Sequence, residues 1–366
     1  MALPGLTVTA NRSEFLDADT GVRIRFGAGV VSEAGNEVER LSCERALILS
    51  TPQQSDAALM LAETIGIRAA GVFTKAAMHT PVEISEEAVS HAKGVNADCV
   101  VSMGGGSTIG LGKAIAFRTD LPQITIPTTY AGSEATPILG QTEDGVKTTL
   151  TDKRVLPEVI LYDPELVRTL PVAMSVTSGL NAMAHAAEAL YAQNRTETST
   201  AQALEGLEAL IDGLPQVIAN PNSLEARQTT QYGAWLCGTV LGKVGMALHH
   251  KLCHTLGGSF DLPHAETHAV VLPHAIAYNE RSAGKELKPL ADLLGKGRAA
   301  GGLYEFSRSL NAPMALSAFG LKESQLDRAA ELSVKKPYWN PHPISKEEIR
   351  AMLQSIWSGD APAHIE

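Results

Sequence analysis

Histidines are crowded into one stretch of the chain, residues 245–274, which reads GMALHHKLCHTLGGSFDLPHAETHAVVLPH. It holds six of the protein's eleven histidines: His249, His250, His254, His264, His268 and His274. Imidazole both titrates near neutral pH and binds transition metals. Any one of these histidines is more often a satisfied core or surface residue. The spacing of the group favours a site for proton transfer or metal binding.

Two of these histidines have helical spacing. His250 and His254 are four residues apart in a segment of helix formers, so both imidazoles are expected on one helix face. Gly257-Gly258 is expected to end that helix, before a turn that precedes His264.

Upstream, Asn181 and His185 show the same four-residue spacing and are followed by Glu188. Such a pair is usually structural when it stands alone. If it is buried beside the histidine stretch, the set expected around one site is Asn181, His185, His250 and His264.

A glycine-rich turn offers a second kind of chemistry. Gly104-Gly105-Gly106-Ser107 follows the apolar run ADCVVSM and precedes a helical pattern. Small residues let a phosphate approach the backbone, and a helix N-terminus offers unpaired N–H groups. The segment is therefore a candidate cradle for a dinucleotide. The GxGxxG fingerprint is absent, so a plain tight turn remains the alternative.

A hydroxyl-rich loop, PTTYAGSE at 127–134, follows the next apolar run and contains Thr128, Thr129 and Ser133. Open α/β sheets bind ligands at the carboxyl ends of their strands. The loop and the glycine-rich turn are expected to line one crevice, although an ordinary polar loop would read the same way.

Short apolar runs alternate with helical patterns up to residue 163, as expected for a parallel sheet with helices on both faces. The runs lie at 46–50, 69–73, 97–103, 123–127 and 158–162. Beyond about residue 170 only helical patterns occur, the clearest at 180–192, 200–214, 224–242 and 344–357. The sequence thus predicts a Rossmann-like α/β domain over 1–163 and an all-helical domain over 164–366, with the active site in the cleft between them.

Composition excludes several classes of protein. The formal net charge of −10 argues against nucleic acid and anionic membranes as partners. The four cysteines are scattered, the first residues lack an export signal, and no run of 18 apolar residues occurs. A cytoplasmic protein with reduced thiols is expected.

Several separated motifs together resemble the iron-containing (group III) alcohol dehydrogenase family, which has a dehydroquinate synthase-like fold. They are GGGS, PTT…GSE, the helix with His185, and HHKLCH…LPH, in that order. The phrases LPVAMSVTSGLNAMAHAAEALYA and PTTYAGSEATPILGQTEDGVKTT are similar to the branch of the family that reduces the C=C bond of 2-maleylacetate to 3-oxoadipate. That branch acts in bacterial breakdown of aromatic compounds. The resemblance implies NADH or NADPH as cofactor, a small dicarboxylate substrate and a homodimer.

The resemblance also implies a vestigial metal site. Metal-binding members use one Asp and three His, and the histidines match His185, His250 and His264. The Asp position is Asn181, which removes a negative charge and a hard-cation ligand. Reduction of an activated C=C bond passes through an enolate that hydrogen-bond donors can stabilise, so no metal is expected to be required.

Other functions remain open. A metal-dependent NAD(P) alcohol or hydroxyacid dehydrogenase of the same fold would use the three histidines for zinc or iron. A binding protein without catalysis and dehydroquinate synthase-like chemistry are more remote.

By resemblance, Gly105, Gly106 and Ser107 would hold the pyrophosphate, and Thr128 and Thr129 would line the nicotinamide side of the crevice. Lys147 would lie near the nicotinamide ribose, and Ser133 is a further cofactor-binding candidate. His254 would be the proton donor, while Lys243 and Lys251 are candidates for the substrate carboxylates.

Two further positions depart from the family pattern. Thr51 stands where relatives carry an Asp that repels the NADPH phosphate, so NADPH should be accepted beside NADH. Gly110 stands where the family often has another Asp.

Overall fold

The structure of the protein, a computed structural model, describes residues 13–363. These residues form two compact units, the first reaching Leu170 and including Asn222–Gln231, the second comprising Pro171–Pro221 and the chain from Tyr232 onward. The predicted boundary after residue 163 put residues 164–170 and 222–231 in the helical domain, whereas the structure groups them with the first unit. The expectation of an active site in a cleft between domains stays a prediction. The first twelve residues, on which the expected lack of an export signal depends, lie outside the described range.

The first unit is built around a mostly parallel sheet. Its strands are β1 (Ser13–Leu16), β2 (Arg23–Phe26), β3 (Ala46–Leu49), β4 (Ala69–Phe73), β5 (Cys99–Gly104), β6 (Gln123–Pro127) and β9 (Val159–Tyr162). Their spatial order is β1-β2-β9-β6-β5-β3-β4, and only β1 is antiparallel to its neighbour. The predicted α/β class is confirmed.

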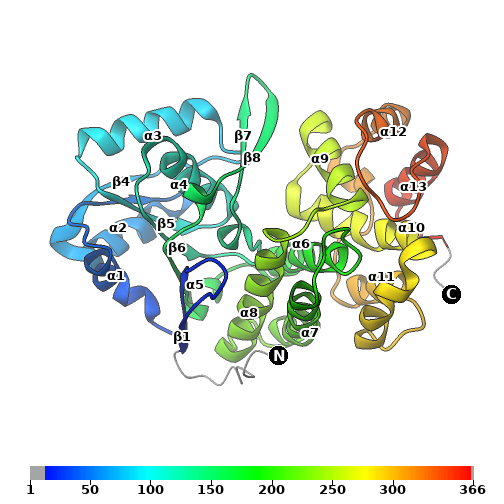
Figure 1. Ribbon diagram of the computed structural model, residues 1–366, viewed down its shortest axis with the longest axis horizontal. Helices are drawn as coiled ribbons and strands as arrows, with labels where there is room; N and C mark the ends of the chain where they lie inside the picture. The colour runs from blue at the N-terminus through cyan, green and yellow to red at the C-terminus, as the bar shows by residue number, and fades with distance from the viewer. Residues whose placement is uncertain (1–12, 364–366) are drawn as a thin grey trace. The chain divides into compact units, whose positions relative to one another are not determined.

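Helices cover both faces of this sheet (Figure 1). They are α1 (Ala34–Arg40), α2 (Ser55–Ile65), α3 (Val82–Gly94), α4 (Gly106–Thr119) and the short α5 (Pro164–Val167). One core joins α1 and α2 to alternate strand residues such as Ile48 and Val101, and the other joins α3 and α4 to residues such as Leu47 and Val100. Because successive strand side chains point to opposite faces, the continuous apolar runs supply both cores.

The chain order reverses between β3 and β5. From β3 the chain continues outward to β4, and it then returns to β5 and proceeds the other way to β6. Such a switch point leaves a crevice at the carboxyl ends of the two strands. Thr51 follows β3 there, and the glycine-rich turn follows β5.

An unpredicted hairpin, β7 (Ile138–Glu143) and β8 (Val146–Thr151), stands away from the main sheet (Figure 1). Its turn residues Asp144 and Gly145 both have positive φ, 49° and 75°. Asp-Gly is a favoured pair for such tight turns.

The second unit has no strand among its described residues, which confirms the predicted helical class. Its helices are α6 (Val172–Ala189), α7 (Glu197–Ala219), α8 (Leu224–Leu241), α9 (Leu248–Phe260), α10 (His264–Leu293), α11 (Ala299–Ser309), α12 (Leu326–Val334) and α13 (Lys346–Ser358). The start of α8 is counted with the first unit. None of the helices in the described part of the chain is both long and apolar enough to span a membrane.

The helix break expected at Gly257-Gly258 is wrong. Helix α9 continues to Phe260, and Asp261 ends it in the left-handed conformation, with φ 53°. Leu252 and Leu256 of this helix are buried in a core shared with α10, α12 and α13. Packing of the helix on this core therefore outweighs the low helix propensity of the glycine pair.

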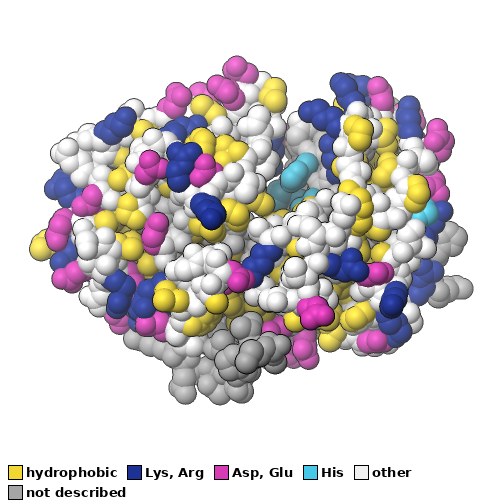
Figure 2. All heavy atoms as spheres, viewed as in Figure 1, with side chains coloured by type: hydrophobic (Ala, Val, Ile, Leu, Met, Phe, Trp, Pro, Cys, Tyr) yellow, Lys and Arg dark blue, Asp and Glu magenta, His cyan; other side chains and the backbone are white. Residues whose placement is uncertain are grey.

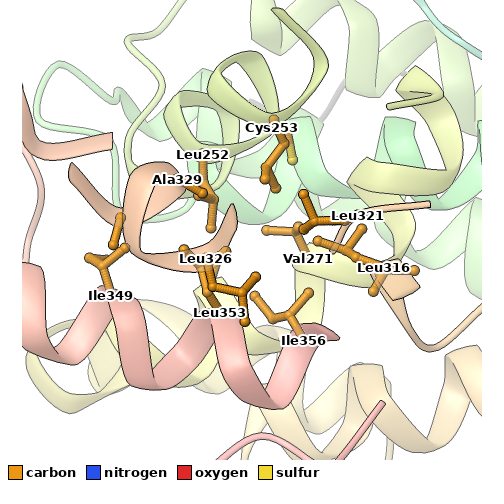
Figure 3. Close-up of a cluster of buried hydrophobic side chains, with 14 of the residues drawn as sticks. Leu252, Cys253, Val271, Leu316, Leu321, Leu326, Ala329, Ile349, Leu353 and Ile356 are labelled. Atoms are coloured by element: carbon orange, nitrogen blue, oxygen red, sulfur yellow. The ribbon is translucent and has the colours of Figure 1, made fainter. Parts of the chain in front are cut away.

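Figure 3 shows part of this core, in which Leu252 and Cys253 of α9 meet Leu326 of α12 and Leu353 of α13. The core fixes the helix that carries His250. Cys253 is one of four free, buried cysteines; Cys43 and Cys99 belong to the first unit, Cys237 and Cys253 to the second.

Candidate active site

Helix α6 aligns three polar side chains along one face of the second unit. Asn181, His185 and Glu188 follow each other at spacings of four and three residues, which stack on a helix, and all three are buried. Burial of polar groups in a helix of mostly alanine and other small residues requires partners.

Glu188 finds its partners at the start of α9. Its carboxylate accepts backbone N–H groups of Ala247 and His249 at 3.0 and 2.9 Å. Nδ1 of His250 lies 2.7 Å from Oε2 of the same carboxylate. Glu188 therefore both caps the N-terminus of α9 and orients His250, since the carboxylate accepts a hydrogen bond from Nδ1 and leaves Nε2 facing elsewhere.

A buried network holds Glu188 in turn. Tyr191 donates its hydroxyl proton to Glu188 at 3.1 Å and accepts from Asn279 of α10 at 3.1 Å. Asn279 exchanges two hydrogen bonds with Asn340, whose Oδ1 also accepts the N–H of Leu248. The position of His250 is thus fixed by polar contacts from three separate segments.

Five other imidazoles gather around that of His250. Its ring centroid lies 5.1 Å from those of His185 and His249, 5.2 Å from His268 and 6.3 Å from His254. His264 lies 4.2 Å from His268. The predicted gathering of His185, His250, His254 and His264 is present within one unit, whereas His274 instead borders a separate cavity of about 260 Å³.

Burial distinguishes these histidines. His254 is exposed, His264 is half-buried, and the other four are buried. Figure 2 shows histidine side chains at the visible surface. Nε2 of His250, Nδ1 of His185 and both ring nitrogens of His268 are buried without a hydrogen-bond partner. Such orphaned polar atoms are rare and costly unless a ligand serves them.

Burial also sets the protonation of the group. It lowers the pKa of His249 to about 4 and of His250 to about 3, and neighbouring imidazoles add to both shifts. The pKa values of His185 and His268 fall well below the usual range for the same reasons. The charge of the Glu188 carboxylate partly opposes the lowering of the His249 pKa. Without substrate, the buried imidazoles are neutral at pH 7.

The first unit places the predicted cofactor residues at the switch point of its sheet. Helix α4 begins at Gly106 directly after β5, with Gly105 as its N-cap. A Cβ on Gly105 would lie 2.9 Å from Cγ2 of Thr129, while Gly106 faces open space. The N–H of Thr128 donates to the carbonyl of Gly104, and the side-chain amide of Gln54 donates to the hydroxyl of Thr128. The segments after β3, β5 and β6 therefore meet at one edge of the sheet.

Three buried side chains hold the loop at 128–138. Lys113 of α4 donates to the carbonyls of Ser133, Thr136 and Ile138 at 2.5–2.9 Å and to Oγ1 of Thr136 at 3.0 Å. Glu134 accepts from Tyr162, and Tyr130 accepts from Arg227 of α8. Burial lowers the pKa of Lys113 to about 7, opposed by the charge of Glu134.

The remaining predicted residues take separate positions. Thr51 lies two residues after the end of β3, as the N-cap of a short 3₁₀ turn. Lys147 lies half-buried on β8, where burial lowers its pKa. Lys243 donates to Gln202 of α7 at 2.8 Å, whereas Lys251 of α9 lies over the ring of Tyr338.

The departure at Gly110 has a steric reason. A Cβ at that position would lie 2.3 Å from Oγ1 of Thr80. A side chain such as the Asp of relatives would therefore clash unless Thr80 moved.

Comparison with known proteins decides the family. Residues 21–164 match the model described as iron-containing alcohol dehydrogenase, and residues 175–357 match that of the Fe-containing alcohol dehydrogenase family, C-terminal. The chain belongs to the iron-containing alcohol dehydrogenase family.

Its relatives point to one branch of that family. Maleylacetate reductase from Rhizobium sp. (strain MTP-10005) is 59% identical over 348 residues, which are 95% of this chain and 99% of the relative. The enzyme of the same name from Burkholderia cepacia is 49% identical, covering 93% and 97%. The crystal structure of maleylacetate reductase from Agrobacterium tumefaciens superimposes with a TM-score of 0.91 at 60% identity, covering 93% of this chain and 97% of that one.

The metal for which the family is named does not fit the matching positions here. Asn181 offers a neutral amide where the family pattern has a carboxylate. In the described part of the chain, ligand atoms of three or more His, Cys, Asp or Glu residues come within 4.8 Å of one another in two groups, and His185, His250 and His264 are not one of them.

Sequence reasoning gave no role to three residues that shape the site, Glu188, His249 and His268. The three-residue spacing of Glu188 from His185 was a usable signal, since it puts both on one helix face. The pairing of Glu188 with His250 joins residues 62 apart and leaves no local pattern.

Proposed function

We propose that this oxidoreductase reduces the C=C bond of 2-maleylacetate with NADH or NADPH, giving 3-oxoadipate. The observation that carries the proposal is 59% identity to a maleylacetate reductase along 99% of that enzyme's length. The imidazole group of the second unit and the crevice of the first provide the chemistry that such a reaction needs.

In this reaction, the alkene carbon farther from the ketone accepts a hydride, which NADH or NADPH would supply when bound. The electron pair of the C=C bond moves toward the ketone and forms an enolate. The alkene carbon nearer the ketone then takes up one proton. Hydrogen-bond donors aimed at the developing oxyanion stabilise such an intermediate, often by several kcal/mol.

His250 is the residue that we assign to the enolate. Its Nδ1 is held by Glu188, so its buried Nε2 is the atom presented to a ligand. A bound dicarboxylate favours protonation of neighbouring imidazoles, which makes Nε2 a donor. His185, with its buried and unpartnered Nδ1, is assigned to the substrate beside it.

His254 remains our candidate for the proton donor to carbon. It lies one turn beyond His250 on α9 and is exposed. A donor must regain its proton from water after each turnover, which exposure permits. A general acid of this kind contributes about 10²–10⁴ in rate.

The cofactor is assigned to the first unit, with its pyrophosphate at Gly105, Gly106 and Ser107, where the N-terminus of α4 favours an anion. The well-held loop with Thr128 and Thr129 is assigned to the nicotinamide side. No acidic side chain stands at Thr51 to repel a 2′-phosphate, which supports the use of both NADH and NADPH.

We further propose that turnover needs no metal. The amide of Asn181 and the separation of the histidine nitrogens at the family's ligand positions support this view. A metal-dependent alcohol dehydrogenase needs a Lewis acid on its alkoxide, whereas an enolate next to imidazoles does not.

The test is NADH oxidation with freshly generated maleylacetate, on protein as purified and after exhaustive chelation, with metal analysis of both samples. Equal activity with metal content near zero is expected. Activity that disappears on chelation and returns with zinc or iron would overturn the metal-free mechanism. Oxidation of alcohols with NAD and no turnover of maleylacetate would overturn the assigned reaction.

A further inference from the structure

Three buried histidines converge at positions that the family pattern does not use for metal. His249 and His250 of α9 and His268 of α10 each offer one ring nitrogen, and these three atoms lie within 4.8 Å of one another. The ring of His268 lies 5.0 Å from that of His249 and 5.2 Å from that of His250. Only His250 also belongs to the family's ligand positions.

Hydrogen bonds indicate which nitrogens carry lone pairs. Nε2 of His249 lies 2.9 Å from the carbonyl oxygen of His268, which can only accept, so Nε2 holds the proton and Nδ1 is free of one. Nδ1 of His250 donates to Glu188, so its Nε2 holds the lone pair. His268 has no hydrogen-bond partner on either nitrogen, so one lone pair is available in each neutral tautomer.

We propose that His249, His250 and His268 bind a single divalent transition-metal ion of the zinc type, and that this ion inhibits the enzyme. Inhibition follows because the ion takes Nε2 of His250, the atom assigned to the enolate. The inhibition rests on the proposed function, whereas the binding does not.

The ligand set selects the class of ion. Three neutral imidazoles suit zinc, cobalt or nickel, and a water completes a tetrahedral His₃ site. Magnesium and calcium prefer oxygen ligands and are not expected to bind. The Glu188–His250 hydrogen bond would be retained, as carboxylates commonly support a metal-bound histidine from its other nitrogen.

The geometry requires only local adjustment. Zn–N bonds of 2.0–2.1 Å place tetrahedral ligand atoms about 3.3 Å apart. The three ring nitrogens lie within 4.8 Å of one another, so they must approach by up to about 1.5 Å. The unpartnered nitrogens of His250 and His268 would gain a partner, which offsets the cost of leaving them unpaired, about 1–3 kcal/mol each.

The binding test uses wild-type protein stripped with a chelator and titrated with Co²⁺, whose visible absorption reports tetrahedral coordination. One ion per chain, displaced by Zn²⁺, is expected. His268→Asn and His249→Asn should weaken binding by more than the roughly 10–100-fold typical for loss of a supporting partner. The matched control is His264→Asn, one turn from His268 on α10, which should keep the wild-type affinity.

Two results would overturn the site. One is the absence of any tetrahedral cobalt signal in wild-type protein. The other is loss of binding in His264→Asn and His185→Asn with retention in His268→Asn, which would put the ion at the family's positions. If a variant fails to fold, X-ray absorption of zinc-loaded wild-type protein tests the site without any variant. Three imidazole ligands on the zinc are expected, and fewer than three would reject the site.

Activity assays then separate the two proposals. Zinc-loaded protein should lose maleylacetate reduction and regain it on chelation. Bound zinc with unchanged turnover would reject the inhibition alone. Protein without activity before zinc is added would reject the proposed function while leaving the binding result intact.

Discussion

At the scale of single residues, Glu188 carries the most consequence. One buried carboxylate caps α9 through Ala247 and His249 and orients His250 through Nδ1. The helix-capping role of Glu188 can be separated from its role in orienting His250, because Glu280 caps a helix and does not orient His250. Glu280 caps the start of α11 through Ala299 and Ala300 and touches no histidine of the group.

Glu188→Gln should lower kcat by about 10–100-fold, the usual cost of losing a partner that orients an active group. Glu188 accepts from Nδ1 of His250 with Oε2 and from the N–H of His249 with Oε1, and a glutamine has only one oxygen for these two donors. NADH binding, measured by fluorescence titration, should stay at the wild-type value. The matched Glu280→Gln variant should lose stability and retain kcat. Equal kcat losses in both variants would show that Glu188 acts through the fold alone.

His254→Gln should lose about 10²–10⁴ in kcat while NADH still binds, as expected for removal of a general acid. The side chain is exposed, so the variant should fold as the wild type does. Steady-state assays at saturating maleylacetate measure the effect. Unchanged kcat would move the donor role to another imidazole.

Thr51→Asp should raise the preference for NADH over NADPH, because a carboxylate at the end of β3 repels the 2′-phosphate. The ratio of kcat/KM for the two cofactors measures this. An unchanged ratio would mean that the ribose lies elsewhere.

At the scale of elements, the loop at 128–138 is held in place before any cofactor arrives. Lys113 serves three carbonyls of this loop, while Tyr162 and Arg227 fix Glu134 and Tyr130. Because the loop is already ordered, less free energy is lost in ordering it when the cofactor binds.

Lys113→Met should therefore weaken NADH binding about tenfold, equivalent to 1.4 kcal/mol, because the carbonyls of Ser133, Thr136 and Ile138 lose their donor. The KM for maleylacetate should change little, since the assigned substrate residues lie in the other unit. The exposed Lys75→Met serves as control. Lower stability with unchanged NADH affinity would contradict a role in cofactor binding.

The sequence predicted best those elements in which every residue is buried. Strands such as β3 and β9 are continuous apolar runs that are buried along their whole length, and their type and position follow directly. The β7–β8 hairpin was missed because most of its strand residues are polar and only one of them, Leu139, is buried. The helix break at Gly257-Gly258 was wrong because tertiary packing of Leu252 and Leu256 decides that segment. Contacts such as that of Glu188 with His250 arise only once distant helices meet.

At the scale of the whole molecule, the negative net charge of the protein disfavours the approach of the proposed dianionic substrate. A protein with formal net charge −10 repels a dianion, and the repulsion is screened by salt. Raising ionic strength from about 10 to 150 mM should therefore lower the KM for maleylacetate by a factor of about two to three. Initial rates in an inert salt measure this. A KM that rises with salt would indicate a locally positive approach to the imidazole group.

The four buried cysteine thiols can report how often each unit opens. Cys43 and Cys99 sit in the first unit, Cys237 and Cys253 in the second, and a labelling reagent reaches none of them in the closed state. Modification must wait for the surrounding structure to open, so its rate reports the local opening equilibrium. Mass analysis of partly labelled protein would therefore follow the opening of the two units separately, and saturating NADH should slow labelling in the unit that binds it.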